Sequence, residues 1–89
     1  MNEALDALKV RFTARCADDR LRLKSAVDDA DTAALKMLAH KIAGAGGVFG
    51  FAELSRAAMT VEDQIDLGLE VEPEQIAKLD ALLAEAAQA

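Results

Sequence analysis

The sequence has no tryptophan and no tyrosine, and its 89 residues include only three phenylalanines, one proline and one cysteine. Strands favour β-branched and aromatic residues, so their scarcity comes close to excluding an all-β fold. A single cysteine cannot form an intramolecular disulfide. The chain also lacks a basic start followed by an apolar run, so we expect neither a signal peptide nor a membrane span. These absences together predict a soluble, cytoplasmic protein.

Positive charge is scarce as well. Ten basic residues against sixteen acidic ones give a net charge of −6. This charge repels a polyanion, and the few aromatic rings offer no platform on which bases could stack, so nucleic acid is not an expected partner. A core this small can hardly contain a deep substrate pocket. A role in binding partners at the surface is therefore favoured over that of an autonomous enzyme.

Alanine and leucine dominate the composition, with 20 and 12 residues respectively. Both are strong helix formers, and apolar residues recur at helical spacing along nearly the whole chain. The pattern predicts four amphipathic helices with short connections, which favour antiparallel neighbours. We therefore expect an all-α fold, an up-and-down antiparallel four-helix bundle, in which residues 1–89 form a single domain.

The first predicted helix, over residues 2–30, carries one acidic residue on its apolar stripe. The apolar members of this stripe are Leu5, Leu8, Phe12, Cys16, Leu23, Ala26 and Ala30. Asp19 falls among them, so either the helix is broken or kinked near residues 17–19, or the carboxyl group faces solvent at one end of the bundle. The N-terminal residues either continue this helix or form a short extra one.

Three further helices follow, and each has a recognisable boundary. Asp31 is an N-cap candidate for the second, and the glycine-rich run over residues 44–50 predicts its end near residues 47–50. The third ends near Gly68, and Pro73 is well placed in the first turn of the fourth. The apolar positions of these helices are Leu35, Leu38, Ala39, Ile42, Leu54, Ala58, Val61, Ile65, Ile76, Leu79, Leu83 and Ala87.

His40 is the only histidine, and the periodicity of its helix places it on the solvent face. It lies roughly 160° from the centre of the apolar stripe, at ~100° per residue. Gly44 and Gly47 face the same way, whereas Gly46 faces the core and is explained by close helix packing. Because glycine weakens a helix, the bare strip beside the imidazole indicates a surface that another protein must approach closely.

Other kinds of site fit these residues poorly. A metal site is disfavoured because there is no second histidine, Cys16 lies on a buried stripe, and no carboxylate stands three or four residues from His40. Ser25 and Ser55 lack the motif of a catalytic triad. The glycine run has Phe49 where a dinucleotide-binding loop needs glycine, and it lacks the Gly-Lys pair of a P-loop.

The stretch LAHKIAGAGGVFGF over residues 38–51, followed by Leu54 and by Val61 and Glu62, resembles the histidine-containing phosphotransfer (HPt) domain family. Members of that family are helical bundles with a phospho-accepting histidine exposed on a central helix. A glycine follows four residues later, and another glycine precedes the next helix. The corresponding positions here are His40, Gly44 and Gly50.

One position departs from the family pattern, because many members carry a lysine three residues after the histidine and this chain has Ala43. Lys36 and Lys41 are the nearby cations that can stabilise the charge of a phosphoryl group on His40 in its place. The resemblance implies that His40 accepts a phosphoryl group from the aspartate of one receiver domain and passes it to another. It also implies that Mg²⁺ belongs to the receiver, so the chain needs no cofactor or metal of its own.

The resemblance implies that the partners are response-regulator receiver domains, with a hybrid histidine kinase as a further candidate. We expect a monomer that binds neither nucleic acid nor a membrane, and a phosphocarrier without an ATP-binding or kinase domain. The residues expected to let the partner come close are Met37, Ala43, Gly44 and Gly47.

Two other functions use the same features. A phosphorylation-silent helical adaptor would bind or sequester a receiver domain through the bare face, and the retention of His40 argues against it. The dimerisation fragment of a histidine kinase also carries a histidine on a helix, but it normally needs an adjacent acidic residue, where this chain has Lys41. Such a fragment would also be an obligate dimer.

Overall fold

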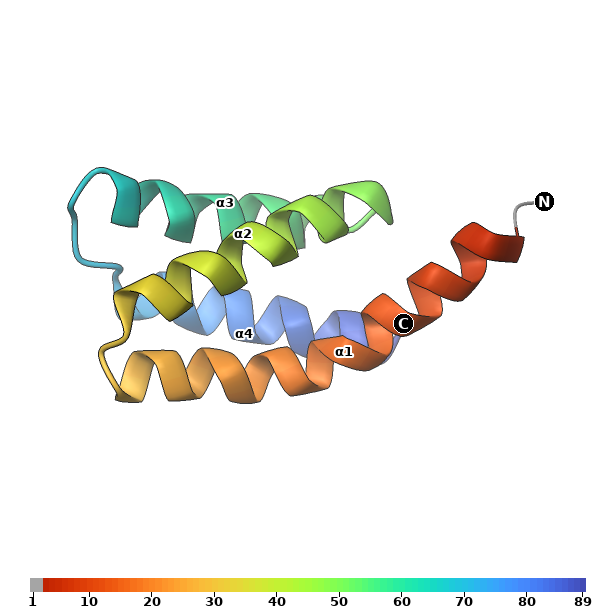
Figure 1. Ribbon diagram of the computed structural model, residues 1–89, viewed down its shortest axis with the longest axis horizontal. Helices are drawn as coiled ribbons and strands as arrows, with labels where there is room; N and C mark the ends of the chain where they lie inside the picture. Colours follow the sequence, from red (N-terminus) through yellow and green to blue (C-terminus); the bar gives the residue numbers. More distant parts are fainter. Residues whose placement is uncertain (1–2) are drawn as a thin grey trace.

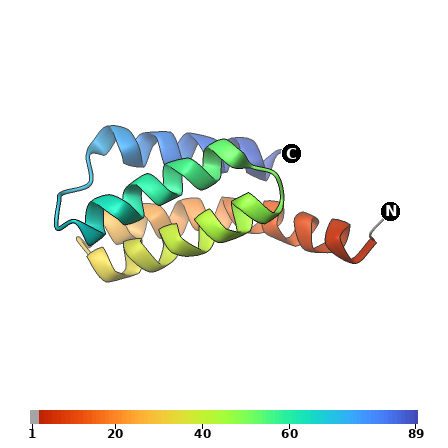
Figure 2. The ribbon, with the colours of Figure 1, turned by 90° about the horizontal axis from the view of Figure 1, so that it is seen from above.

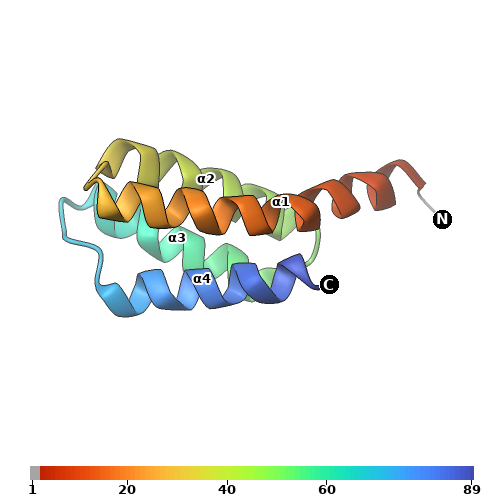
Figure 3. The same cartoon turned by 90° about the horizontal axis from the view of Figure 1, so that it is seen from below.

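Four helices make up most of residues 3–89, the part of the chain that the computed structural model describes. They are α1 (Glu3–Asp28), α2 (Thr32–Val48), α3 (Ala52–Asp66) and α4 (Pro73–Ala87) (Figure 1). Each helix packs against the next one in the chain, and α4 packs back against α1. Figures 2 and 3 show the same up-and-down order from two further sides. The predicted four-helix bundle is confirmed, and no separate helix precedes α1 within the described residues.

The helix boundaries follow from local chemistry. The Asp31 side chain caps α2 by accepting a hydrogen bond of 3.0 Å from the Ala34 N–H. At the other end of α2, Gly50 has a φ of +85°, a conformation that glycine adopts without strain. This turn lets the Phe51 N–H donate to the Gly46 carbonyl at 2.8 Å, which is the pattern of a helix ending in a left-handed residue. The predicted stop near residues 47–50 is confirmed.

The core is one apolar cluster to which all four helices contribute. Its largest fully buried apolar side chains are Leu23, Ile42, Val61, Leu79 and Leu83. The three phenylalanines gather at one end of it, where the ring of Phe12 lies 5.5 Å from that of Phe49 and 5.6 Å from that of Phe51, between centroids. These contacts join α1 to the turn between α2 and α3.

The predicted stripe of α1 is wrong at both of its ends. Leu5 and Leu8 are 41% and 49% exposed, and Ala30 lies in the turn after the helix with a φ of +51°. The reason is length, because α1 has 26 residues whereas the other helices have 15 to 17. Its first turns therefore extend beyond the bundle, as Figure 1 shows, and Phe12 is its first buried residue.

The structure contradicts a break of the helix at Asp19 and a solvent-facing carboxyl group. The helix α1 runs without a break through residues 17–19, and Asp19 is only 7% exposed. Burial raises the pKa of its carboxyl group above the ordinary value of 3.8, although the cations of Arg22, Lys41 and Arg15 act in the opposite direction. An acidic residue on an apolar stripe is therefore accommodated inside the bundle, close enough to basic side chains for them to offset part of the cost.

We expect the Asp19→Asn variant to be more stable than the wild type near neutral pH. A carboxyl group whose pKa is raised by folding binds its proton more tightly in the folded state, so stability falls as the pH rises from about 3.8 through the folded pKa. Urea unfolding followed by circular dichroism should show a gain at about pH 7 that shrinks below about pH 4. Asp18→Asn, at the exposed neighbouring position, is the control. A loss of stability that is equal at both pH values would contradict the prediction.

Candidate functional site

The imidazole of His40 stands on α2 beside α3, and its side chain is 75% exposed. Two pairs of side chains cross the seam between these helices, one helical turn apart. His40 contacts Glu62, and Lys36 forms an ion pair with Asp66. The spacing of four residues on both helices shows that α2 and α3 run antiparallel in a fixed register. The predicted solvent-facing position of His40 is confirmed.

Glu62 determines which nitrogen of the ring is free. Its carboxylate oxygen Oε2 lies 2.8 Å from Nδ1 of His40, and the Glu62 side chain is only 19% exposed. A carboxylate can only accept hydrogen bonds, so Nδ1 donates and carries the proton of the neutral ring. The other nitrogen, Nε2, then keeps its lone pair. The arrangement presents one oriented nucleophilic nitrogen on an exposed face.

The sequence did not predict Glu62 as an orienting carboxylate, because no local pattern links it to His40. The partner is 22 residues away and comes from the next helix. The sequence nevertheless contains a pattern that indicates this pairing. Lys36 and His40 are four residues apart on one predicted helix, and the acidic residues Glu62 and Asp66 are four residues apart on the next. Two such pairs on consecutive antiparallel helices indicate a seam of complementary side chains.

The two lysines predicted to stabilise phosphoryl charge lie on different sides of α2. Lys36 is on the α3 side, where the hydrogen bond and the charge of Asp66 raise the pKa of its ammonium group. Lys41 lies toward α1, close enough to the buried Asp19 to lower the pKa of that carboxyl group. Only Lys36 therefore shares the flank of the helix on which His40 meets Glu62.

Of the residues predicted to form the partner's approach surface, Met37, Gly44 and Gly47 are exposed. Met37 is 69% exposed, and no atom beyond the glycine's own neighbourhood in α2 lies within 4 Å of the position that a Cβ at Gly44 would occupy. Ala43 is the exception and that prediction is wrong, because it is only 9% exposed. Its position faces α3, and its carbonyl accepts a 2.7 Å hydrogen bond from the Ser55 hydroxyl.

Gly46 has a different role from its neighbouring glycines. A Cβ built there would lie 3.3 Å from the Ser55 nitrogen and 3.4 Å from the Phe51 carbonyl oxygen, both of which are backbone atoms of the segment that begins α3. At Gly47 the nearest atom would be the Ser55 hydroxyl oxygen, at an ordinary 3.6 Å. Close helix packing therefore explains Gly46, as predicted, and does not explain Gly44 or Gly47.

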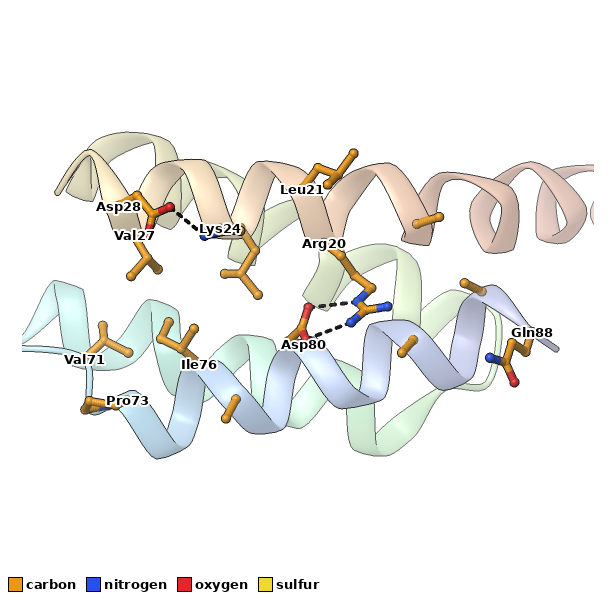
Figure 4. Close-up of a pocket in the computed structure, with 15 residues that line it drawn as sticks. Arg20, Leu21, Lys24, Val27, Asp28, Val71, Pro73, Ile76, Asp80 and Gln88 are labelled. Carbon is orange, nitrogen blue, oxygen red and sulfur yellow. Dashed lines mark hydrogen bonds and ion pairs between the residues drawn. The ribbon is translucent and has the colours of Figure 1, made fainter.

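An open groove of about 700 Å³ lies elsewhere, between α1 and α4 (Figure 4). Apolar side chains such as Val27 and Ile76 line it, and a two-pronged ion pair between Arg20 and Asp80 bridges its walls, with N···O distances of 2.9 and 3.1 Å. Its lining residues come from α1, α4, the connection before α4 and the residue that follows α4. The groove is thus separate from the seam that holds His40.

Residues 3–89 contain no group of three or more histidine, cysteine, aspartate or glutamate side chains arranged to hold a metal ion. Cys16 is fully buried, and burial, with a smaller effect from the charge of Asp19, raises the pKa of its thiol to about 11. It is therefore protonated at neutral pH and unsuited to bind metal as a thiolate. Within the same described range, no helix combines the length and the apolar character needed to cross a membrane.

A four-helix bundle that presents one oriented imidazole on the exposed face of a central helix has the architecture of a histidine phosphotransfer module. The model of the Hpt domain family matches residues 7–89, so the chain belongs to the Hpt domain family. Hpt domains are phosphocarriers of two-component signalling and not kinases, so the role of this chain is histidine phosphotransfer in a phosphorelay. Comparisons with curated proteins and with solved structures gave no significant match.

The contact with Glu62 predicts the protonation of the neutral ring. In the wild type at about pH 9, the proton of His40 should reside mainly on Nδ1, because the carboxylate accepts it there. In Glu62→Ala this preference should be lost, and ¹⁵N chemical shifts of the two ring nitrogens, measured by long-range ¹H–¹⁵N correlation, report it directly. Asp63→Ala removes an exposed acid from the adjacent position and is the control. Identical nitrogen shifts in the wild type and in Glu62→Ala would contradict the assignment.

Proposed function

We propose that the chain is a phosphorelay intermediate in which His40 accepts a phosphoryl group from the aspartate of one receiver domain and delivers it to the aspartate of another. The observation that carries this proposal is the geometry of the ring. Nδ1 is held by Glu62 at 2.8 Å while the side chain as a whole is 75% exposed. Nε2 is therefore oriented by the protein and open to a partner.

The bonds and charges of the phosphoryl transfer balance without a further reactant. The Nε2 lone pair attacks the phosphorus of the acyl phosphate, the N–P bond forms, and the P–O bond to the aspartate breaks. The aspartate leaves as a carboxylate with the bonding electron pair. The ring becomes a phosphoimidazolium that keeps its Nδ1 proton, and the nearby Glu62 carboxylate stabilises the new positive charge. Attack by a second receiver aspartate on the same phosphorus reverses these bond changes.

The surroundings of His40 suit a reaction that takes place between two proteins. Gly44 and Gly47 leave part of the exposed surface without side chains, and the exposed Met37 adds an apolar contact, so that a receiver can approach the ring. We assign the stabilisation of phosphoryl charge to Lys36 and Lys41, and the Mg²⁺ ion to the receiver. His40 and Glu62 come from one chain, so the site is complete in a monomer.

Incubation with a phosphorylated receiver domain and Mg²⁺ should add one phosphoryl group to the wild-type chain and none to His40→Gln. The reason is that only Nε2 of His40 combines exposure with orientation by a carboxylate. Intact-mass spectrometry without acid measures the gain, and a second sample treated with acid should lose it, as phosphohistidine does. Circular dichroism of His40→Gln is the control for folding.

If several active receivers leave the wild-type mass unchanged, the phosphocarrier proposal fails. A receiver that nevertheless binds the chain in a pull-down would then support the alternative, a helical adaptor that binds or sequesters receiver domains. A gain that persists in His40→Gln would place the phosphoryl group on a different residue.

Gly44→Leu should slow phosphotransfer while leaving the fold intact. No atom outside the local turn of α2 lies within 4 Å of the Cβ position, so the leucine projects into solvent and the helix gains about 0.5–1 kcal/mol from replacing glycine. The bulk stands one turn from His40, where it holds the receiver away from Nε2, and we expect the transfer rate to fall about tenfold or more.

Ala81→Leu is the matched control, because position 81 is exposed on α4 and α4 does not pack against α2. Rapid-quench phosphotransfer assays give the rates, and urea unfolding gives the stabilities. A Gly44→Leu chain that transfers as fast as the wild type would show that this face is not approached by the receiver.

A further inference from the structure

The ion pair between Lys36 and Asp66 lies one helical turn from His40, on the same seam. We propose that Asp66 is a positioning residue that controls how available Lys36 is to the phosphoryl group, so that Lys36 exchanges Asp66 for phosphohistidine when His40 is phosphorylated. This inference rests on the proposed function of His40. It adds a residue of α3 that sets the balance of phosphoryl transfer.

The register of the seam places the Lys36–Asp66 ion pair next to the His40–Glu62 contact. Lys36 precedes His40 by four residues on α2, and Asp66 follows Glu62 by four residues on α3. The two interhelical contacts are therefore neighbours, one helical turn apart. The pKa of the Lys36 ammonium is raised by its hydrogen bond to Asp66 and by the charge of Asp66, and the charge of Glu62 makes the smallest contribution. The ammonium group therefore lies beside Asp66, in the pair of side chains next to the one that contains His40.

Exchange of partners is favoured by charge and by exposure. The Lys36 and Asp66 side chains are both 46% exposed, and ion pairs at such positions are weak because solvent screens them. A phosphoryl group carries about −1.5 to −2 charges near neutral pH and three acceptor oxygens, against the single charge of a carboxylate. Once a phosphoryl group is bonded to Nε2, it is the stronger partner for a lysine one turn away.

Within the described residues 3–89, the other positions of α2 next to His40 supply no cation on this flank of the ring. The position three residues after His40 is Ala43, which is buried against α3. Lys41 directly follows His40, about 100° further round the helix, and its charge acts on the carboxyl group of Asp19 on α1. The charge of the phosphoryl group on the α3 side is therefore balanced by Lys36, and Asp66 competes for it.

The test is the equilibrium distribution of the phosphoryl group between the receiver aspartate and His40. A receiver domain charged with a small acyl phosphate in the presence of Mg²⁺ is mixed with the full chain after the excess donor is removed. Intact-mass spectrometry without acid gives the fraction on each protein. Asp66→Asn frees Lys36, so the equilibrium should move about two- to fivefold toward His40, whereas Lys36→Gln should move it by a similar factor toward the receiver.

The double variant separates an effect that acts through Lys36 from a general change of charge. In the Lys36→Gln background, Asp66→Asn should have little further effect, because there is no ammonium group left to release. Lys36→Arg keeps the cation and should remain close to the wild type. The control is Asp28→Asn, which makes the same charge change in an exposed lysine-aspartate pair on α1 and should not move the equilibrium.

Equal shifts for Asp66→Asn in the wild-type and Lys36→Gln backgrounds would overturn the inference and leave only a direct charge effect. Equal distributions for the wild type, Asp66→Asn and Asp28→Asn would overturn it as well, while the proposed function would stand because His40 still becomes phosphorylated. A wild-type chain that takes up no phosphoryl group would overturn both proposals. Circular dichroism of each variant verifies that the fold is retained.

Discussion

The close approach of α2 and α3 at Gly46 is the contact on which the rest of the site depends. A side chain at this position would begin 3.3 Å from the Ser55 backbone nitrogen, so only glycine lets the two backbones meet without displacement. The Ser55 hydroxyl adds a 2.7 Å hydrogen bond to the Ala43 carbonyl. Because both contacts tie α2 to the start of α3, they fix the register of the whole seam, and the register places Glu62 opposite His40.

The same end of the bundle also anchors α1. Gly50, with its positive φ, turns the chain so tightly that Phe49 and Phe51 both reach Phe12. The ammonium group of Lys9 lies 5.5 Å from the centroid of the Phe51 ring, which is within the range of a cation–π contact. A chain with three aromatic residues thus uses all of them in one cluster, and the seam is held from the α1 side as well as by its own contacts.

Helical periodicity was sufficient to predict the four helices, the N-cap at Asp31 and the exposed position of His40, because each depends on residues within about two turns. It failed where the answer depended on another helix. The exposure of Leu5 and Leu8 follows from the shorter neighbours of α1, and the burial of Asp19 and Ala43 follows from the packing of their helices against neighbouring ones. The pairing of His40 with Glu62 required the register of the seam, which no local pattern contains.

The seam divides into a charged half and a bare half, and His40 stands where they meet. On one side of His40 the seam contains the oppositely charged Lys36 and Asp66. On the other side, Gly44 and Gly47 leave it almost without side chains. Packing does not require glycine at the latter two positions, and each lowers helix stability by about 1 kcal/mol relative to alanine. This cost is a sizeable fraction of the free energy of unfolding of a small domain, which is about 5–15 kcal/mol. The bare half therefore supports the proposal that a partner reaches Nε2 from this side.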